Sequence, residues 1–355
     1  MDLEMLARKM PEALDGIFIT SECNIFYLTG FECDAAVMLI SRNGSVFFTD
    51  SRYIEAARKK IKCCEIENTT EIKTRLNEYC KKWDIKRLGA EAGRITVADA
   101  NKYLNMLEGV EFVFGKTTDS FISSFRSVKT GEEIKLINEA QGLAEFAFDH
   151  IKAYIEVGMT EREVQLELDH FMLKNGADDL SFKTIVVSGK NSSMPHGVPS
   201  DKKIEKGDLI TLDFGAVIKG YHSDMTRTVA AVRFGDREKE IYEIVRRAQE
   251  KALAAVKPGM LCRDIDYIAR KVIEDAGYGE YFGHSLGHGV GVEIHEEPSV
   301  GPKSEAVLEV GNVITIEPGI YIPGEFGVRI EDMVAVSEDG CYNFTKCSKD
   351  FVTVG

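Results

Sequence analysis

The first third of the chain alternates between short apolar stretches and amphipathic ones, a pattern typical of a mixed α/β domain. The apolar stretches predict strands and the amphipathic stretches predict helices. Asn43-Gly44, between two of the predicted strands, favours a tight hairpin turn. The predicted strands are 16–20, 35–40, 46–49, 87–90 and 111–114, and the predicted helices are 51–60 and 71–83.

The pattern changes near residue 125, where we place a domain boundary. Thr130 and Glu133 have the spacing of a capping box, and apolar residues at helical spacing continue from 134 to 151. We therefore expect an α/β N-terminal domain at residues 1–124 and a larger domain at residues 125–355. The first domain contains no cluster of potential ligands, so we expect it to shape a cleft or to form an oligomer contact.

The larger domain contains an internal repeat. Residues 157–164 match residues 258–265 at an offset of 101, and Asn175-Gly176 matches Ala276-Gly277 at the same offset. Both copies lie between two predicted helices. The alternative is coincidence between two helix-turn-helix connections. The repeat otherwise predicts two related α/β halves that face each other across a cleft.

Composition and charge exclude several classes of protein. At 355 residues the chain exceeds what one core usually covers, which favours two domains. The net charge of −14, with no concentrated run of Lys and Arg, argues against a nucleic-acid partner. No basic, apolar leader and no stretch of about 18 apolar residues is present, so we expect a cytoplasmic protein without a membrane contact. The eight cysteines lack C-x-x-C spacing and are expected to be reduced.

Histidines are concentrated in one glycine-rich window, residues 282–298. Three of the seven histidines in the chain lie there, and the glycines between them disfavour a helix. This clustering indicates a functional site. The window also contains a G-x-S-x-G pattern, but no histidine follows His295, so a serine hydrolase's base would lie within ten residues of the serine with no acid properly between them. Metal binding is therefore the better interpretation. The three residues are His284, His288 and His295.

Two predicted hairpins supply carboxylates. In the first, residues 209–229, a symmetric turn centred between Ile218 and Lys219 would place Asp213 opposite Asp224. Carboxylates about 5 Å apart repel each other unless a proton or a cation lies between them.

The second hairpin, residues 313–333, repeats this arrangement. A turn centred on Gly324 would place Glu317 opposite Glu331, with Arg329 on the same side. Four carboxylates and one imidazole suit two divalent ions such as Mn²⁺, Co²⁺, Zn²⁺ or Fe²⁺. Two such ions about 3.5–4 Å apart can share a hydroxide and polarise a carbonyl, so the ligand set predicts hydrolysis.

These residues resemble the metal ligands of the pita-bread metallopeptidases, family M24, and the resemblance covers essentially the whole chain. The run from His284 to Glu296 is similar to the Xaa-Pro peptidase signature of that family. The resemblance implies an α/β (α+β) pita-bread catalytic domain with a pseudo-two-fold repeat, preceded by a smaller creatinase-like α/β domain. The five matching ligands are Asp213, Asp224, His288, Glu317 and Glu331.

The resemblance also implies a division of roles. Asp213 would bind one ion, Asp224 and Glu331 would bridge both ions, and His288 and Glu317 would complete the second ion's ligands.

Other residues would act on the substrate. His196 and His295 would position the scissile carbonyl and stabilise the oxyanion, and Glu317 would manage the proton of the metal-bridging hydroxide. His284 and Arg329 are expected to bind the substrate, Arg329 as a candidate for capturing a free carboxylate.

The same resemblance selects a branch of the family. Methionyl aminopeptidases usually lack both the front domain and a histidine four residues before the metal-binding histidine, and this chain has both. We therefore expect a metalloexopeptidase that cleaves Xaa-Pro bonds at the N-terminus of peptides, an Xaa-Pro aminopeptidase. The alternative is an Xaa-Pro dipeptidase (prolidase), because the motifs are shared. The intact ligand set argues against creatinase and against a non-catalytic peptide-binding protein of the same fold. Two divalent ions, Mn²⁺ first and Co²⁺ or Zn²⁺ next, and a homodimer are implied.

Overall fold

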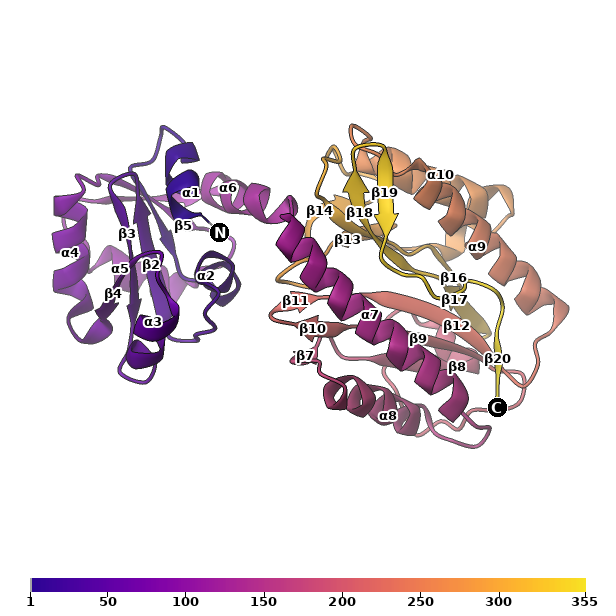
Figure 1. Cartoon of the computed structure of the whole chain (residues 1–355). Coiled ribbons are helices and arrows are strands. Elements are labelled where there is room, and N and C mark those ends of the chain that lie inside the picture. The colour runs from indigo at the N-terminus through magenta and orange to yellow at the C-terminus, as the bar shows by residue number, and fades with distance from the viewer. Residues whose placement is uncertain (1) are drawn as a thin grey trace. The chain divides into compact units, whose positions relative to one another are not determined.

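The computed structural model describes residues 2–355, which form two compact units (Figure 1). The first unit ends at Arg126 and the second runs from Ser127 to Gly355.

The first unit is built on a six-stranded sheet with the order β4-β3-β2-β1-β5-β6. β2 and β3 form the predicted hairpin, with Ser41 paired to Gly44. The sequence missed β4, which is polar, and the helices α1, α2, α5 and α6. The strands are β1 Gly16–Ile19, β2 Ala36–Ser41, β3 Gly44–Thr49, β4 Glu65–Asn68, β5 Arg87–Glu91 and β6 Glu111–Gly115. The helices are α1 Leu3–Lys9, α2 Glu22–Thr29, α3 Ile54–Lys60, η1 Thr69–Glu71, α4 Ile72–Lys82, α5 Val97–Leu104 and α6 Lys116–Ser127.

The second unit begins with the long predicted helix α7, Gly131–Tyr154, whose first turn is closed by the capping box of Thr130 and Glu133. Its sheets have the orders β20-β12-β9-β8, β14-β13-β15-β18-β19, β11-β10-β7 and β16-β17. The strands are β7 Asp179–Leu180, β8 Ile185–Ser188, β9 Leu209–Phe214, β10 Ala216–Ile218, β11 Tyr221–His222, β12 Met225–Ala231, β13 Gly287–Gly289, β14 Glu296–Val300, β15 Val313–Ile316, β16 Gly319–Ile322, β17 Phe326–Arg329, β18 Asp332–Ser337, β19 Gly340–Asn343 and β20 Thr353–Val354.

Two helix pairs cover these sheets (Figure 1). α7 and α8 share one hydrophobic core with β8, β9 and β12, whereas α9 and α10 share another with β15 to β18. The remaining helices are α8 Glu161–Lys174, η2 Gly189–Ser193, α9 Asp236–Ala255, α10 Cys262–Asp275 and η3 Gly279–Tyr281. The predicted α/β class is therefore confirmed.

The internal repeat is confirmed at the level of the backbone. α8 and α10 begin and end at residues that differ by the predicted offset of 101. The preceding turns contain Gly158 and Gly259 at φ 97° and 84°, a conformation that glycine adopts without steric cost. Gly158 donates its N–H to the Ile204 carbonyl and Gly259 donates to the Leu308 carbonyl, so both halves make the same connection.

The predicted register of the first carboxylate hairpin is wrong. Asp213 on β9 pairs with Thr226 on β12, so Asp224 lies two positions from the residue opposite Asp213. The turn is formed by Lys219 and Gly220, both at positive φ (48° and 78°). A two-residue hairpin turn of this type needs positive φ at both central positions, which moves the centre of the turn by one residue from the predicted place.

The predicted register of the second hairpin is confirmed. Gly319 pairs with Arg329, and Ile316 pairs with Asp332, which centres the turn on Gly324 at φ 75°. Glu317 and Glu331 lie at facing positions between these two ladders.

A buried ion pair joins the two hairpins. Arg227 on β12 donates to Asp332 on β18 at 2.8 Å, and Lys349 donates to the same carboxylate at 2.6 Å. Burial alone would raise the pKa of Asp332, but Arg227 and Lys349 hold the pKa below its ordinary value. Asp332 follows Glu331 directly, so this pair fixes the backbone at a predicted ligand.

We expect Arg227→Met to destabilise the second unit by about 3–5 kcal/mol, because it leaves the buried Asp332 carboxylate without its main partner. Urea unfolding of the full chain, followed by circular dichroism, measures the loss. Trp83, the only tryptophan, lies in the first unit, so its fluorescence reports that unit separately. The control Arg237→Met removes the exposed pair with Glu325 and should cost no more than about 1 kcal/mol. Equal costs for both variants would contradict the prediction.

Candidate metal centre

The residues predicted for the site come together in one cavity of about 580 Å³ in the second unit. They come from both halves of the repeat. One half contributes the loop after η2 and the hairpin of β9 to β12, and the other contributes β13, the end of β17 and the segments next to β13, β14, β16 and β17. Those lining the cavity are His196, Asp213, Asp224, His284, His288, His295, Glu317, Arg329 and Glu331.

The His288 ring is oriented with its Nε2 atom toward the acids of the cavity. Its Nδ1 lies 3.0 Å from the carbonyl oxygen of Gly289, which leaves Nε2 to face the acids. Nε2 lies 3.5 Å from Asp224 Oδ2 and 3.4 Å from Glu317 Oε1. Burial lowers the pKa of His288 to about 4, so the ring is neutral at pH 7 and its Nε2 lone pair is available.

Asp224 and Glu331 are buried together with this imidazole. Ligand atoms of Asp224, His288 and Glu331 all lie within 4.8 Å of one another. Burial, and then the neighbouring carboxylates, raise the pKa of Asp224 and of Glu331 well above their ordinary values. Two buried carboxylates this close need a proton or a cation between them.

Glu331 also has an unused acceptor. Its Oε2 accepts a hydrogen bond from Thr226 Oγ1 at 2.6 Å, whereas its buried Oε1 has no hydrogen-bond partner among the described residues. A buried carboxylate oxygen without a donor is unfavourable, and a bound cation would satisfy it. This oxygen, together with the set of oxygen donors and one nitrogen donor, fits a divalent metal ion.

Asp213 and Glu317 line the same cavity as this cluster. Asp213 Oδ2 accepts a hydrogen bond from the Arg329 guanidinium, and Glu317 Oε1 accepts from Thr315 Oγ1 at 3.2 Å. Burial raises the pKa of Glu317 to about 8, although Arg329 opposes the increase. Glu317 therefore holds a proton near neutral pH when no cation is bound.

Arg329 belongs to a hydrogen-bonded chain that the sequence analysis only partly identified. Its Nη1 donates to Tyr321 Oη at 2.8 Å and to the Pro195 carbonyl at 3.2 Å. Tyr321 Oη lies 3.1 Å from His284 Nε2, and His284 Nδ1 lies 2.7 Å from the Ser285 carbonyl. Burial lowers the pKa of His284 to about 4, so its ring is neutral and accepts from Tyr321.

Tyr321 and Thr226 were missed because each reads as an ordinary strand residue. Only the register reveals them. Tyr321 lies two positions from Gly319, the partner of Arg329, and Thr226 is the partner of Asp213.

His196 and His295 reach the cavity from two loops. His295 directly precedes β14, and its ring centroid lies 4.4 Å from that of His288. The loop of His196 follows η2 and is anchored by the buried Glu161, the first residue of α8. Glu161 accepts from the backbone N–H groups of Ser188 at 2.7 Å and Ser200 at 3.1 Å.

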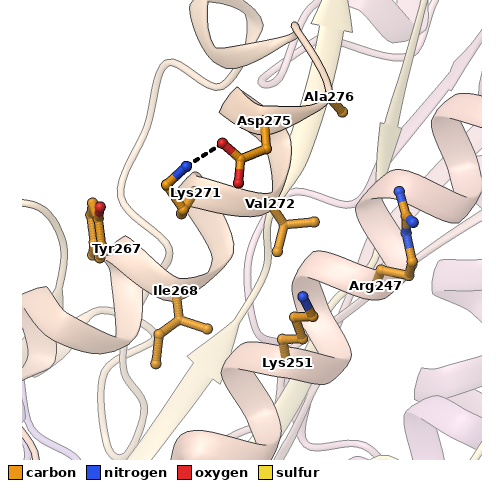
Figure 2. Close-up of a pocket in the computed structure, with 8 residues that line it drawn as sticks. All are labelled: Arg247, Lys251, Tyr267, Ile268, Lys271, Val272, Asp275 and Ala276. Carbon is orange, nitrogen blue, oxygen red and sulfur yellow. Dashed lines mark hydrogen bonds and ion pairs between the residues drawn. The ribbon is translucent and has the colours of Figure 1, made fainter.

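A second cavity, of about 510 Å³, lies between α9 and α10 (Figure 2). Lys271 and Asp275 form an ion pair there, and Ile268 and Val272 contribute apolar surface. None of the predicted site residues lines this cavity. In residues 2–355, no helix is long and apolar enough to cross a membrane.

Comparisons with known proteins show the family to which the chain belongs. Residues 135–338 match metallopeptidase family M24, and residues 3–128 match the creatinase/prolidase N-terminal domain. The chain is 39% identical to an Xaa-Pro dipeptidase of Pyrococcus furiosus over 99% of both chains.

Solved structures are similar over the same length. An Xaa-Pro dipeptidase from Bacillus anthracis is 42% identical with a TM-score of 0.95, covering 99% of each chain. An X-Pro aminopeptidase from Thermotoga maritima is 35% identical with a TM-score of 0.91, covering 99% of this chain and 100% of that one. The chain therefore belongs to metallopeptidase family M24, with a creatinase/prolidase N-terminal domain ahead of its catalytic domain, and this family implies that the site holds divalent metal ions.

Proposed function

We propose that the protein hydrolyses the Xaa-Pro bond of dipeptides, as an Xaa-Pro dipeptidase. The observation that carries the proposal is the buried cluster of Asp224, Glu331 and His288 within a cavity large enough for a short peptide. The motifs alone favoured an aminopeptidase. Several of the most similar named relatives are Xaa-Pro dipeptidases, which supports the alternative more strongly. An aminopeptidase, like the similar Thermotoga maritima protein, is the second candidate.

Two divalent ions, with Mn²⁺ as the first choice, would be held by the five predicted ligands. Bound divalent ions supply Lewis acidity and lower the pKa of water to near neutrality. The five residues are Asp213, Asp224, His288, Glu317 and Glu331.

The chain's own groups then move the protons and hold the carbonyl. Glu317 would take a proton from the attacking water and return it to the proline nitrogen as that amine leaves. His295 and His196 would direct N–H groups at the carbonyl oxygen, where negative charge develops in the transition state.

The substrate's proline ring and carboxylate need separate features. The proline nitrogen carries no N–H in the bond to be cleaved, so the site recognises the ring by shape, and Phe182, Ile185 and Ile294 line the cavity. Arg329 was the predicted cation for the carboxylate, but it is buried and donates to Asp213 and to Tyr321.

Lys183 is a better candidate for carboxylate capture. It lines the same cavity, its side chain is exposed, and the described residues offer its ammonium no ion-pair partner. We therefore assign recognition of the free proline carboxylate to Lys183 and a supporting role to Arg329. The resemblance also favours a homodimer, which sedimentation would test.

Metal binding should release protons. In the metal-free chain the pKa of Glu317 is about 8 and those of Asp224 and Glu331 are raised well above the ordinary range. A cation must displace these protons, so affinity should increase from pH 6 to pH 9 and proton release should decrease over the same range. Calorimetry with Mn²⁺ in two buffers of different ionisation enthalpy measures the release. The same heat in both buffers at pH 6 would contradict this assignment.

The matched variant is Asp224→Asn, which keeps the shape of the side chain and removes one charge. Metal affinity and peptidase activity should fall together, each by at least about 10-fold. Full activity at full metal content would remove Asp224 from the ligand set.

Substitution of His295 should affect turnover but not metal content. We expect His295→Ala and His196→Ala to lower kcat by on the order of 10²–10³ while metal stoichiometry stays at the wild-type value. Metal analysis of each purified variant separates the two roles. A metal-free His295→Ala protein would instead make His295 a ligand.

Hydrolysis of Ala-Pro, Ala-Pro-amide, Ala-Pro-Ala-Ala and Ala-Ala tests substrate choice. We expect Ala-Pro to be the best substrate and Ala-Ala to be poor. Lys183→Met should raise KM for Ala-Pro about 10-fold and leave Ala-Pro-amide unchanged, because only the acid presents a carboxylate. The control is Lys190→Met, at another lysine of this unit that does not line the cavity. A wild-type preference for Ala-Pro-Ala-Ala would favour the aminopeptidase, and cleavage of no proline peptide would refute the proposal.

A further inference from the structure

The loop of residues 289–296 connects two histidines of the site. Gly289 and Glu296 pair across β13 and β14, so the loop closes on itself. His288 directly precedes the first residue of this pair, and His295 directly precedes the second. The direction of the His295 ring therefore depends on how this short loop is held.

The Glu296 carboxylate lies inside the loop. Its Oε1 accepts a hydrogen bond from the Glu293 backbone N–H at 3.0 Å. A Cβ atom added at Gly291 would lie 2.6 Å from Glu296 Oε2, so the backbone passes too close to the carboxylate for any side chain at that position. The His222 N–H donates to the Gly291 carbonyl at 2.9 Å and fixes the outer side of the loop.

Lys129 holds this carboxylate from outside the loop. Its Nζ lies 3.2 Å from Glu296 Oε2, and the two side chains are 1% and 3% exposed. The Lys129 backbone is itself fixed, since its N–H donates to the Gly311 carbonyl at 2.8 Å and the preceding Val128 forms a bridge with Asn312. Removing one charge of such a buried pair is unfavourable, because the other buried charge loses its oppositely charged partner.

We propose that Lys129 is a positioning residue for His295 and acts through Glu296. The inference rests on the proposed function, in which His295 binds the carbonyl oxygen. The Lys129 ammonium holds the Glu296 carboxylate, and this carboxylate accepts a hydrogen bond from the Glu293 N–H within the loop. His295 lies between Glu293 and Glu296, so the same contacts hold its backbone. Lys129 is not among the residues that line the cavity, so we expect its loss to affect the orientation of His295 and to leave metal and substrate binding intact.

Kinetics of Lys129→Met test this arrangement. We expect kcat for Ala-Pro to fall on the order of 10- to 100-fold, since a small displacement of a catalytic group has an effect of that size. KM and metal content should stay within about twofold of wild type, the pattern of an interaction used only in the transition state. Lys129→Arg, which keeps the charge, should recover part of the loss. Lys152→Met, at a partly buried ion pair on α7, is the control and should not change kcat.

A double-mutant cycle separates positioning from general stability. In a His295→Ala background, Lys129→Met should cause little further loss of kcat, because the residue through which it acts is already absent. An equal loss in both backgrounds, or a loss of metal that parallels the loss of kcat, would overturn the proposal. If Lys129→Met does not fold, Glu296→Gln serves in its place, since it keeps the side-chain shape and the acceptor for Glu293.

Hydrogen exchange tests the role of Lys129 independently of the proposed function, because it does not depend on peptidase activity. If the wild-type protein cleaves no proline peptide, the proposed function fails. In either case, peptides spanning residues 289–296 should exchange faster in Lys129→Met than in wild type, with other segments of the second unit unchanged. Unchanged exchange in this loop would refute the role of Lys129.

Discussion

Repulsion between buried carboxylates is the constraint around which the catalytic unit is arranged. Asp224, Glu317 and Glu331 lie together away from water. Burial and neighbouring carboxylates raise the pKa of each of them above its ordinary value. Arg329 partly offsets this repulsion. Its guanidinium lies against Asp213, and it opposes the increase in the pKa of Glu317. The unused oxygen of Glu331 shows that these protein groups do not fully balance the cluster, which is the condition that favours a cation.

Strand alternation separates this cluster from a second group of charges. Glu331 and Asp332 are adjacent and point to opposite faces, so one carboxylate reaches the site and the other reaches Arg227 and Lys349. The pKa of Glu331 is raised and that of Asp332 is lowered, although both are buried. The difference lies in their partners. Glu331 lies among other carboxylates, which favours a bound cation, whereas Asp332 forms ion pairs with Arg227 and Lys349.

The sequence predicted which residues gather in the cavity better than it predicted the backbone geometry that holds them there. The helical repeat, the capping box at Thr130 and the second hairpin were predicted correctly because glycines and caps determine local backbone geometry. The first hairpin was placed one residue away, because the position of the two positive-φ residues cannot be obtained from the alternation of apolar residues. The ligand candidates were identifiable by residue type.

Their supporting residues were not identifiable in this way. Tyr321, Thr226 and Lys129 act through contacts with residues that are distant in sequence, and a single residue of each type is common in any chain. Lys183 was missed for the same reason, since only the cavity places it near the site. Short elements such as β7 and β11, each two residues long, carry too few positions for a periodic pattern to be detected.

The predicted ligands come from both halves of the repeat, which has a consequence for how the protein folds. Asp213 and Asp224 belong to the half that contains α8, whereas His288, Glu317 and Glu331 belong to the half that contains α10. The contacts between the halves join residues that are distant along the chain, such as Asp224 with His288 and Asp213 with Arg329, and such long-range contacts form late because the closure of large loops costs entropy first. The helix pairs and the hairpins can form from local contacts, so we expect the halves to acquire structure before the site does. The site would then be the last part of the unit to assemble and the first to open.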